Sequence, residues 1–349
     1  MAKEALNYLI PQEKSKLITM GSEEQIKKIM VEMKRMGRKA CEIALDFAMN
    51  EEYEHEVIRE AINYFMRELW GNFLHPALLA ISCEAVGGNS ERTTLVGASL
   101  VLLTGAADVH DDIIDKSKTK GSKMTIFGKF GGDIALLVGD ALLFKGLMLL
   151  NAACENFPKK KGETVKELIK RGFFKLGAAE TLESTFKGNW NISPEEFLEV
   201  IKKKAAVAEA AARAGAVIGD ATPEEVRDWG RIGQILSMLS NIRDEFVDMF
   251  EAEELKNRRD NECLPLPILY AMCNHEVRKE IIYILKKREL TNNDVIKVAD
   301  IVLETKEVQG LKAKIHNLIK EGKGILCRYR GRPGIELLNN LLDLSREGL

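Results

Sequence analysis

Four aspartates in one short segment are the residues of this sequence best suited to chemistry. Asp108, Asp111, Asp112 and Asp115 recur at spacings of three and four residues, which places their carboxylates on one face of a helix. The residues that precede them, from Thr94 onward, are almost all apolar, which indicates a central helix. Clustered carboxylates in that setting must either be protonated or bind a cation. Mg²⁺ prefers oxygen ligands, and it commonly combines one or two carboxylates with waters or the phosphate oxygens of a substrate. We therefore predict a site for magnesium and a diphosphate. The alternative is a partly exposed acidic helix at the end of a bundle.

A second acidic cluster repeats this pattern about 130 residues later. Asp244, Glu245 and Asp248 have the spacing of the last three aspartates of the first cluster, and they also follow an apolar helical segment. Two acidic faces of the same spacing are a more specific signal than either one alone. If they face each other across a helix bundle, they could hold several Mg²⁺ ions with a diphosphate bridging between them.

The elements that must position these clusters are all predicted to be helices. From about residue 22 to the C-terminus the sequence consists of successive helical segments, with only eight prolines and few alternating β-branched runs. We find no internal repeat, low-complexity linker or change in composition that would mark a domain boundary. We therefore predict one all-α domain over 1–349, a large helix bundle around a central cavity, in which 1–50 is an N-terminal extension of an arm and a helix.

The composition excludes several other classes of protein. A formal net charge of −2, with basic residues spread along the chain, argues against nucleic acid as a partner. The six cysteines form no CxxC pair, which favours reduced thiols and a cytoplasmic location. The N-terminus has no long apolar core of a signal peptide. The longest apolar run, 134–150, contains Asp140 and Lys145, so we predict a buried bundle helix and no transmembrane segment.

A family resemblance follows from the order of these motifs. The segment DDIID is followed by a basic loop with Gly121, then by GGDIALLVGDALL, and later by DEFVD before a Leu-Pro segment. This order resembles the polyprenyl synthetase family, the trans-isoprenyl diphosphate synthases, from about residue 50 to the end. The resemblance implies an all-α bundle around a cavity, usually in a homodimer. It also implies that Mg²⁺ on the two acidic faces binds an allylic prenyl diphosphate and stabilises the departing pyrophosphate.

The resemblance assigns roles to individual residues. It implies catalytic roles for Asp111, Asp112, Asp115 and Lys204, and metal binding by Asp111, Asp112, Asp115, Asp244, Glu245 and Asp248. It implies diphosphate binding by Lys120, Lys204 and Arg243. Ala106 and Ala107 lie where the family often sets the depth of the cavity for the prenyl chain; tight helix packing would explain them equally well.

The departures from the family pattern concentrate on the site for isopentenyl diphosphate. Where the family usually has Gly-Lys-Arg-x-Arg-Pro, this chain has Gly-Asn-Phe-Leu-His-Pro, with Asn72 and His75 at the positions of two charged ligands. Thr104 stands where a diphosphate-binding histidine is common. Since each lost charged hydrogen bond costs on the order of 1.5–3 kcal/mol, this acceptor site is predicted to be degraded.

Three functions are compatible with this pattern. The first is a prenyltransferase-class enzyme that ionises an allylic prenyl diphosphate and passes the prenyl cation to an acceptor, with isopentenyl diphosphate doubtful in that role. The second is a terpene-synthase-like enzyme that cyclises or hydrolyses one prenyl diphosphate. The third is a non-catalytic subunit that forms a heteromer with a competent synthase.

Overall fold

The computed structural model describes residues 20–345, and within that range the chain is almost entirely helical. The predicted arm before residue 20 lies outside the described residues. The N-terminal half contains α2 (Met20–Met49), α3 (Glu56–Tyr64), the π-helix η2 (Phe65–Leu69), α4 (Leu74–Ala85), the 3₁₀ helix η3 (Ser90–Thr93), α5 (Thr94–Ile114), α6 (Ile126–Phe130) and α7 (Gly132–Glu155). A two-stranded antiparallel hairpin, β1 (Thr119–Lys120) and β2 (Lys123–Met124), follows α5. The predicted all-α bundle is confirmed.

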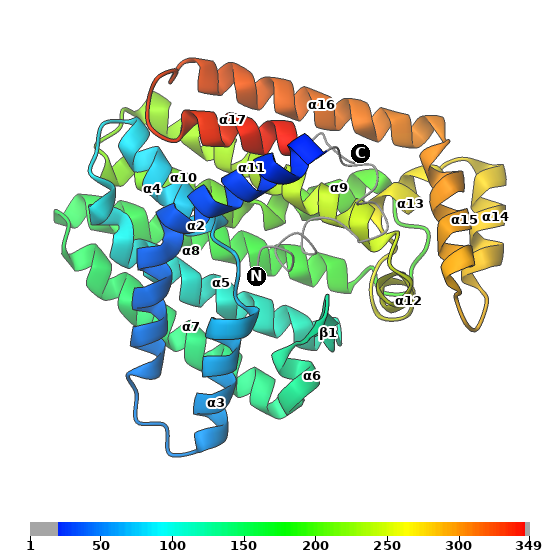
Figure 1. Ribbon diagram of the computed structural model, residues 1–349, viewed down its shortest axis with the longest axis horizontal. Helices are drawn as coiled ribbons and strands as arrows, with labels where there is room; N and C mark the ends of the chain where they lie inside the picture. Colours follow the sequence, from blue (N-terminus) through cyan, green and yellow to red (C-terminus); the bar gives the residue numbers. More distant parts are fainter. Residues whose placement is uncertain (1–19, 346–349) are drawn as a thin grey trace.

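The C-terminal half continues the bundle. It contains α8 (Lys159–Ser184), α9 (Pro194–Lys204), α10 (Ala206–Ile218), α11 (Pro223–Asp248), α12 (Ala252–Asn261), α13 (Leu266–Ala271), α14 (His275–Leu285), α15 (Asn292–Leu303), α16 (Lys306–Cys327) and α17 (Ile335–Leu344). Helices α5 and α10 lie at the centre, where α5 packs against α7, α4 and α2 while α10 packs against α4, α8 and α11 (Figure 1). The pair α14 and α15 projects at one end.

Local sequence signals fix the two helices that carry the acidic clusters. Helix α11 begins at a capping box in which the Thr222 side chain accepts from the backbone of Glu225, with Pro223 in the first turn. Helix α5 ends at Ile114, and Lys116 shortly after it has a φ of 56°, which turns the chain away from the helix axis. Both acidic clusters therefore lie in the last turns of long helices, with the preceding apolar residues in the core.

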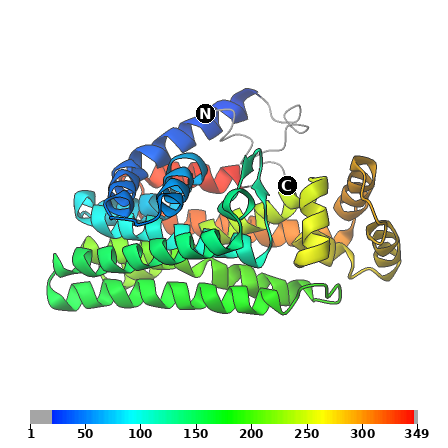
Figure 2. The ribbon, with the colours of Figure 1, turned by 90° about the horizontal axis from the view of Figure 1, so that it is seen from below.

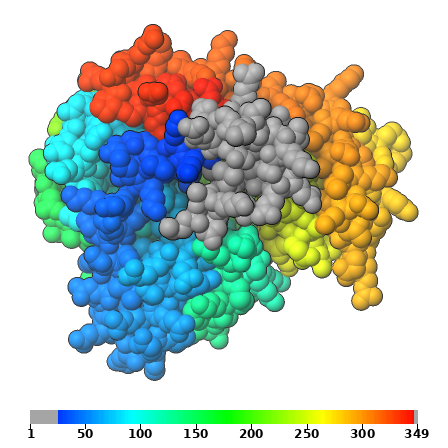
Figure 3. Space-filling view, viewed as in Figure 1, coloured from blue at the N-terminus to red at the C-terminus, as the bar shows by residue number. Residues whose placement is uncertain are grey.

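The N-terminal helix is an integral part of the bundle. Ile26, Ile29 and Met33 of α2 are buried in the same hydrophobic core as α17 at the other end of the chain. Figure 3 shows the two helices next to each other on one face of the molecule. The helical part of the predicted extension therefore packs against α4 and α5 and also against the C-terminal helix α17.

One prediction about burial holds for only one side of its helix. The run 134–150 was expected to be a buried helix, but α7 has a solvent-exposed apolar face. Its members are Leu136, Leu137, Phe144, Leu147 and Met148, and Phe174 of α8 lies exposed as well. Helices α7 and α8 run side by side as one outer layer of the bundle, so this face is on the outside (Figure 2). We call these six residues the α7–α8 apolar face.

A different helix has the length and composition of a membrane span. Residues Ser90–Ile114, which include η3 and α5, pass that test, but 72% of the window is buried inside the protein. A helix at the centre of a soluble bundle has the same properties.

The six cysteines are free, as expected; a cytoplasmic location stays a prediction.

Candidate active site

The first acidic cluster lies at the C-terminal end of α5, where burial perturbs its carboxylates. Asp112 is buried, with 3% exposure, and Asp111 and Asp115 are partly buried. Burial raises the pKa of Asp112 to about 7. Burial and the neighbouring charges of Asp111 and Glu183 raise the pKa of Asp115 to about 6. Asp111 Oδ1 is buried and has no hydrogen-bond partner among the described residues. Ionised carboxylates here would require a counter-charge.

Lysine 120 supplies part of that counter-charge from the hairpin that follows α5. Lys120 Nζ lies 2.6 Å from Asp108 Oδ1 and 3.0 Å from Asp112 Oδ1. Burial alone would lower the pKa of this ammonium, but the charges of the two aspartates outweigh it and raise that pKa. Lys120 thus forms a direct ion pair with the first acidic cluster, while its role in diphosphate binding stays a prediction.

Two more lysines reach the same place from α8 and α9. Lys204, the last residue of α9, forms ion pairs with Glu180 at 3.3 Å and with Glu183. Burial, followed by the charge of Asp111, raises the pKa of Glu180 to about 8. Lys187, just after α8, lies 3.3 Å from Asp115 Oδ1 and donates to the carbonyl oxygen of Ile114 at 2.7 Å.

The second acidic cluster ends α11 and is organised by a buried arginine. Arg258 of α12 donates to Glu245 Oε2 at 2.6 Å and lies 3.6 Å from Asp248 and 3.3 Å from Glu262. Glu245 Oε2 also accepts from the backbone N–H of Leu266 at 2.9 Å. Asp248 is partly buried. Both of these contacts use Oε2 of Glu245. Asp244, by contrast, is exposed.

The structure brings the two clusters together around α8, α9 and α12. The charge of Glu183 raises the pKa of both Asp115 and Glu245, and that of Lys204 lowers both. Asn257 of α12 donates to the carbonyl oxygen of Asp115 at 3.4 Å. Five helices therefore contribute side chains to one acidic site. Among the described residues, no three carboxylate, histidine or cysteine groups already stand as a metal cage, and basic side chains lie between several of the carboxylates.

The three predicted acceptor-site residues are neutral, and two of them are hydrogen-bonded to nearby backbone. The Asn72 side chain accepts from the backbone N–H of Leu74, the first residue of α4, at 3.0 Å. Thr104 Oγ1 donates to the carbonyl oxygen of Leu100 at 2.7 Å within its own helix. Burial lowers the pKa of His75 to about 4, so its ring is uncharged near neutral pH. His75 Nδ1 is buried without a hydrogen-bond partner in the described part of the chain.

The remaining predicted residues lie close to the acidic site. Ala106 is buried and Ala107 partly buried one turn before Asp111 on α5. Arg243 is partly buried beside Asp244. Desolvation raises the pKa of Asp244 to about 7, and the charge of Arg243 offsets only part of that shift. The roles of these residues stay predictions.

Sequence reasoning missed two basic residues of the site. Arg258 lies four residues before Glu262, a helical spacing that could have indicated the pair but not its burial or its contact with Glu245. Lys187 carries no motif, because its contact with Asp115 spans 72 residues and depends on the packing of α8 against the bundle.

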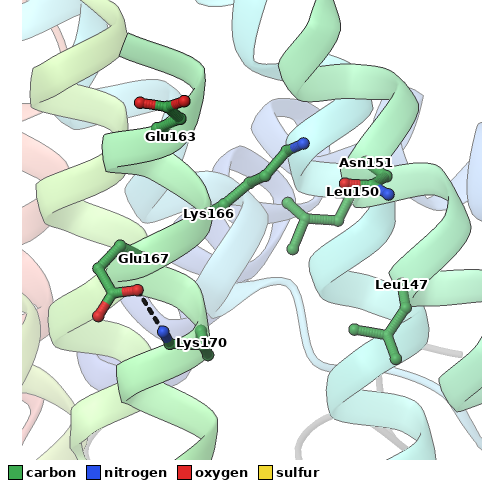
Figure 4. Close-up of a pocket in the computed structure, with 7 residues that line it drawn as sticks. All are labelled: Leu147, Leu150, Asn151, Glu163, Lys166, Glu167 and Lys170. Carbon is green, nitrogen blue, oxygen red and sulfur yellow. Dashed lines mark ion pairs between the residues drawn. The ribbon is translucent and has the colours of Figure 1, made fainter. Parts of the chain in front are cut away.

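A groove of a different kind lies between α7 and α8. Figure 4 shows that three of its residues come from α7 and four from α8: Leu147, Leu150, Asn151, Glu163, Lys166, Glu167 and Lys170. Glu167 and Glu180 are thirteen residues apart on α8, about 20 Å along the helix. This groove is therefore separate from the acidic site and adjoins the α7–α8 apolar face.

The fold and the paired acidic motifs place the protein in the class of all-α, isoprenoid-synthase-like proteins. The sequence profile of the family described as Polyprenyl synthetase matches residues 55–302. The chain belongs to this family, and the predicted class of enzyme, an isoprenyl diphosphate synthase-like protein, is confirmed.

Individual relatives extend over most of the chain. A geranylgeranyl diphosphate synthase of Sulfolobus acidocaldarius is 25% identical over 69% of this chain and 75% of its own length. A geranylgeranyl diphosphate synthase of Methanosarcina mazei is 25% identical over 84% of this chain and 90% of its own length. The crystal structure of a geranylgeranyl pyrophosphate synthetase from Pyrococcus horikoshii superposes with a TM-score of 0.79 over 92% of this chain and 98% of that one, at 21% identity. At that identity the superposition supports the fold alone.

Proposed function

We propose that the protein is a Mg²⁺-dependent prenyltransferase-class enzyme. It ionises an allylic prenyl diphosphate and passes the prenyl cation to an acceptor other than isopentenyl diphosphate. One contrast supports this proposal. The two acidic clusters converge on one site, where Oδ1 of Asp111 has no hydrogen-bond partner among residues 20–345. Asn72, His75 and Thr104, by contrast, carry no charge to hold a second diphosphate.

The residues present fit magnesium. Asp111 and Asp115 at the end of α5, with Asp244 and Asp248 at the end of α11, offer hard oxygen ligands. Asp111 has a buried oxygen without a hydrogen-bond partner in the described part of the chain, and Asp115 has a pKa raised to about 6. Both are properties of carboxylates that would be stabilised by a cation. Bound Mg²⁺ would neutralise charge on the diphosphate as it departs. Glu245 would act by orienting Arg258 and Asp248 rather than as a ligand.

The chain's own cations would complete the diphosphate site. Lys120, Lys187 and Lys204 approach the acidic site from three different elements. Each of these lysines is paired with a carboxylate. When its ammonium turns to a diphosphate oxygen it would form a charge-assisted hydrogen bond there, and the carboxylate would become available to bind metal. The prenyl chain would lie along the small residues Ala106 and Ala107, where apolar walls exclude water from the cation.

The acceptor side has lost the means to hold a diphosphate. A helix N-terminus can bind an anion through its free N–H groups, but on α4 the N–H of Leu74 already donates to Asn72. Losing two or three charged contacts at about 1.5–3 kcal/mol each would weaken binding of isopentenyl diphosphate by several orders of magnitude. The proposed acceptor is therefore a separate, uncharged nucleophile. In the terpene-synthase-like alternative, the cation cyclises onto a double bond of the same prenyl chain or is hydrolysed by water. A non-catalytic subunit in a heteromer is the other.

The α7–α8 apolar face supports the predicted homodimer. Phe144 is 69% exposed and Met148 60% exposed, beside the mixed-charge groove of Figure 4. Exposed apolar patches of this kind mark protein interfaces. A competent synthase of the same fold could cover the same face in the heteromeric alternative.

Product analysis tests the proposed function. Purified protein with Mg²⁺ is incubated with geranyl, farnesyl or geranylgeranyl diphosphate, with and without isopentenyl diphosphate. We expect an alcohol, a hydrocarbon or a transfer product whose formation does not depend on isopentenyl diphosphate. The variant Asn72→Lys/His75→Arg restores two cations to α4, and it should gain elongated diphosphates. Elongation by the unaltered protein would refute a neutral acceptor, and failure to consume any allylic diphosphate would favour the non-catalytic subunit.

A further inference from the structure

One aspartate of the first cluster does not belong to the spacing that the second cluster repeats. Asp108 lies three residues before Asp111 and four before Asp112. Its carboxylate contacts Lys120 at 2.6 Å, and the same ammonium lies 3.0 Å from Asp112. Asp108 and Asp112 are one helical turn apart on α5, so the lysine bridges two consecutive turns on one helix face.

The backbone that carries Lys120 is held in place independently of this ion pair. The hairpin of β1 and β2 receives a hydrogen bond from Tyr64 to the carbonyl oxygen of Met124 at 2.8 Å. Lys123 Nζ donates to the carbonyl oxygen of Glu68 at 2.5 Å. Thr125 Oγ1 donates to the carbonyl oxygen of Ser117 at 2.7 Å. The hairpin is thus tied to η2 and to its own base, and the lysine side chain alone can redirect its ammonium.

We infer that Asp108 is a positioning residue that holds Lys120 as a diphosphate donor. This inference deepens the proposed function and rests on it. When the substrate diphosphate enters, the ammonium leaves Asp112 and donates to a diphosphate oxygen while it keeps its contact with Asp108. Asp112 alone could not hold Lys120 in this way. When Mg²⁺ binds the first acidic cluster, it would displace an ammonium whose only partner is Asp112. Asp108 keeps the lysine charged and within reach in both states.

The inference predicts a sign opposite to that of simple electrostatics. Removing a negative charge from a site that binds an anion should tighten binding of the anion. If Asp108 positions Lys120, Asp108→Asn should instead weaken binding of the anion, because the ammonium is then free to remain on Asp112 or to turn to solvent. The effect must also disappear when Lys120 is absent.

Calorimetric titration with inorganic pyrophosphate in the presence of Mg²⁺ tests the inference without any turnover. The variants are Asp108→Asn, Asp108→Glu, Lys120→Gln and the double variant Asp108→Asn/Lys120→Gln. Matched controls are Asp133→Asn, an exposed acid in the first turn of α7, and Lys118→Gln, an exposed lysine of the same loop. Each control makes the same change of charge away from the Asp108–Lys120 pair.

We expect Lys120→Gln to weaken pyrophosphate about 10- to 100-fold, the loss of one charge-assisted hydrogen bond. Asp108→Asn should weaken it about 3- to 10-fold, Asp108→Glu should restore part of the loss, and the double variant should match Lys120→Gln alone. The controls should change the dissociation constant less than about twofold. Equal or tighter binding by Asp108→Asn overturns the positioning role. Absence of pyrophosphate binding by the unaltered protein overturns the proposed function itself, and the positioning role with it.

Discussion

Arg258 Nη2 lies 2.6 Å from Glu245 Oε2, and both side chains are buried at the end of α11. The same guanidinium lies within ion-pair distance of Asp248 and Glu262. Glu245 also receives the backbone N–H of Leu266, the first residue of α13. This arginine therefore joins three carboxylates and fixes the turn between α12 and α13 against the second acidic cluster.

Replacing that arginine should destabilise the fold. Arg258→Met leaves Glu245 and Glu262 buried without a counter-charge, so we expect the free energy of unfolding to fall by about 3–5 kcal/mol. The measurement is urea-induced unfolding followed by circular dichroism. Arg35→Met is the matched control, because Arg35 forms a solvent-exposed ion pair with Glu32 and its replacement should cost less than about 1 kcal/mol. Equal effects of the two variants would contradict the structural role of Arg258.

The thermal stability of the metal-free protein should decrease with pH. Burial raises the pKa of Glu180 and Glu262 to about 8 and that of Asp112 to about 7, above the value of about 4 in an unfolded chain. The folded state then binds more protons than the unfolded state, and this contribution is lost as pH rises through 7 and 8. We expect the Tm to fall between about pH 6.5 and 8.5, a window above the titration of His75.

Added Mg²⁺ should have its largest effect at the upper end of this range. The ion binds ionised carboxylates, so the rise in Tm that it causes should be greater at about pH 8.5 than at about pH 6.5. Scanning calorimetry with and without Mg²⁺ measures both trends. A Tm that increases with pH in the metal-free protein would contradict the buried state of these carboxylates.

A glycine at the centre of the bundle should be irreplaceable. A Cβ at Gly215 of α10 would lie 2.1 Å from the carbonyl oxygen of Leu79 and 2.1 Å from Ser82 Oγ, both on α4. Gly215→Ala must push the two helices apart, so we expect it to cost at least about 1–3 kcal/mol. Gly310 of α16 has no atom within 4 Å of a Cβ, and Gly310→Ala should stabilise by about 0.5–1 kcal/mol. Chemical unfolding measures the free energy of unfolding of both variants. If Gly215→Ala were as stable as the unaltered protein, the close packing of α10 against α4 would be refuted.

The proposed homodimer depends on the α7–α8 apolar face. Phe144→Glu combined with Leu147→Glu places two charges on that face, and it should convert a dimer into a folded monomer. Light scattering after size-exclusion chromatography gives the mass. Tyr283→Glu is the control, since Tyr283 is 75% exposed on the distant helix α14 and should leave the mass unchanged. A monomeric unaltered protein, or a dimer that survives the double variant, would contradict the assignment of this face.

The sequence predicts the helices and the clusters well, because both depend on local spacing. The aspartates of α5 share a helix face by periodicity alone, and the capping box at Thr222 marks the start of α11. The partners of the clusters depend instead on packing between distant segments. Lys187 meets Asp115 only because α8 returns to α5, and no local pattern indicates this contact.

Burial was the property that the sequence predicted least well. An apolar run such as that of α7 is equally compatible with a core helix and with a helix that packs against another chain. The local contacts of Glu245 were not predicted either: Oε2 of this carboxylate accepts from Arg258 and from the backbone N–H of Leu266, while its role as a metal ligand stays a prediction. Both outcomes depend on neighbours that are remote in the sequence.

Release of pyrophosphate from farnesyl diphosphate tests the central claim most directly. The rate is measured with Mg²⁺, with and without isopentenyl diphosphate, for the unaltered protein and for Asp111→Asn. We predict release that does not depend on isopentenyl diphosphate and that falls at least about 100-fold in the variant, the loss of one metal-binding carboxylate at the departing group. Release that strictly requires isopentenyl diphosphate, or that is the same in Asp111→Asn, would contradict the account.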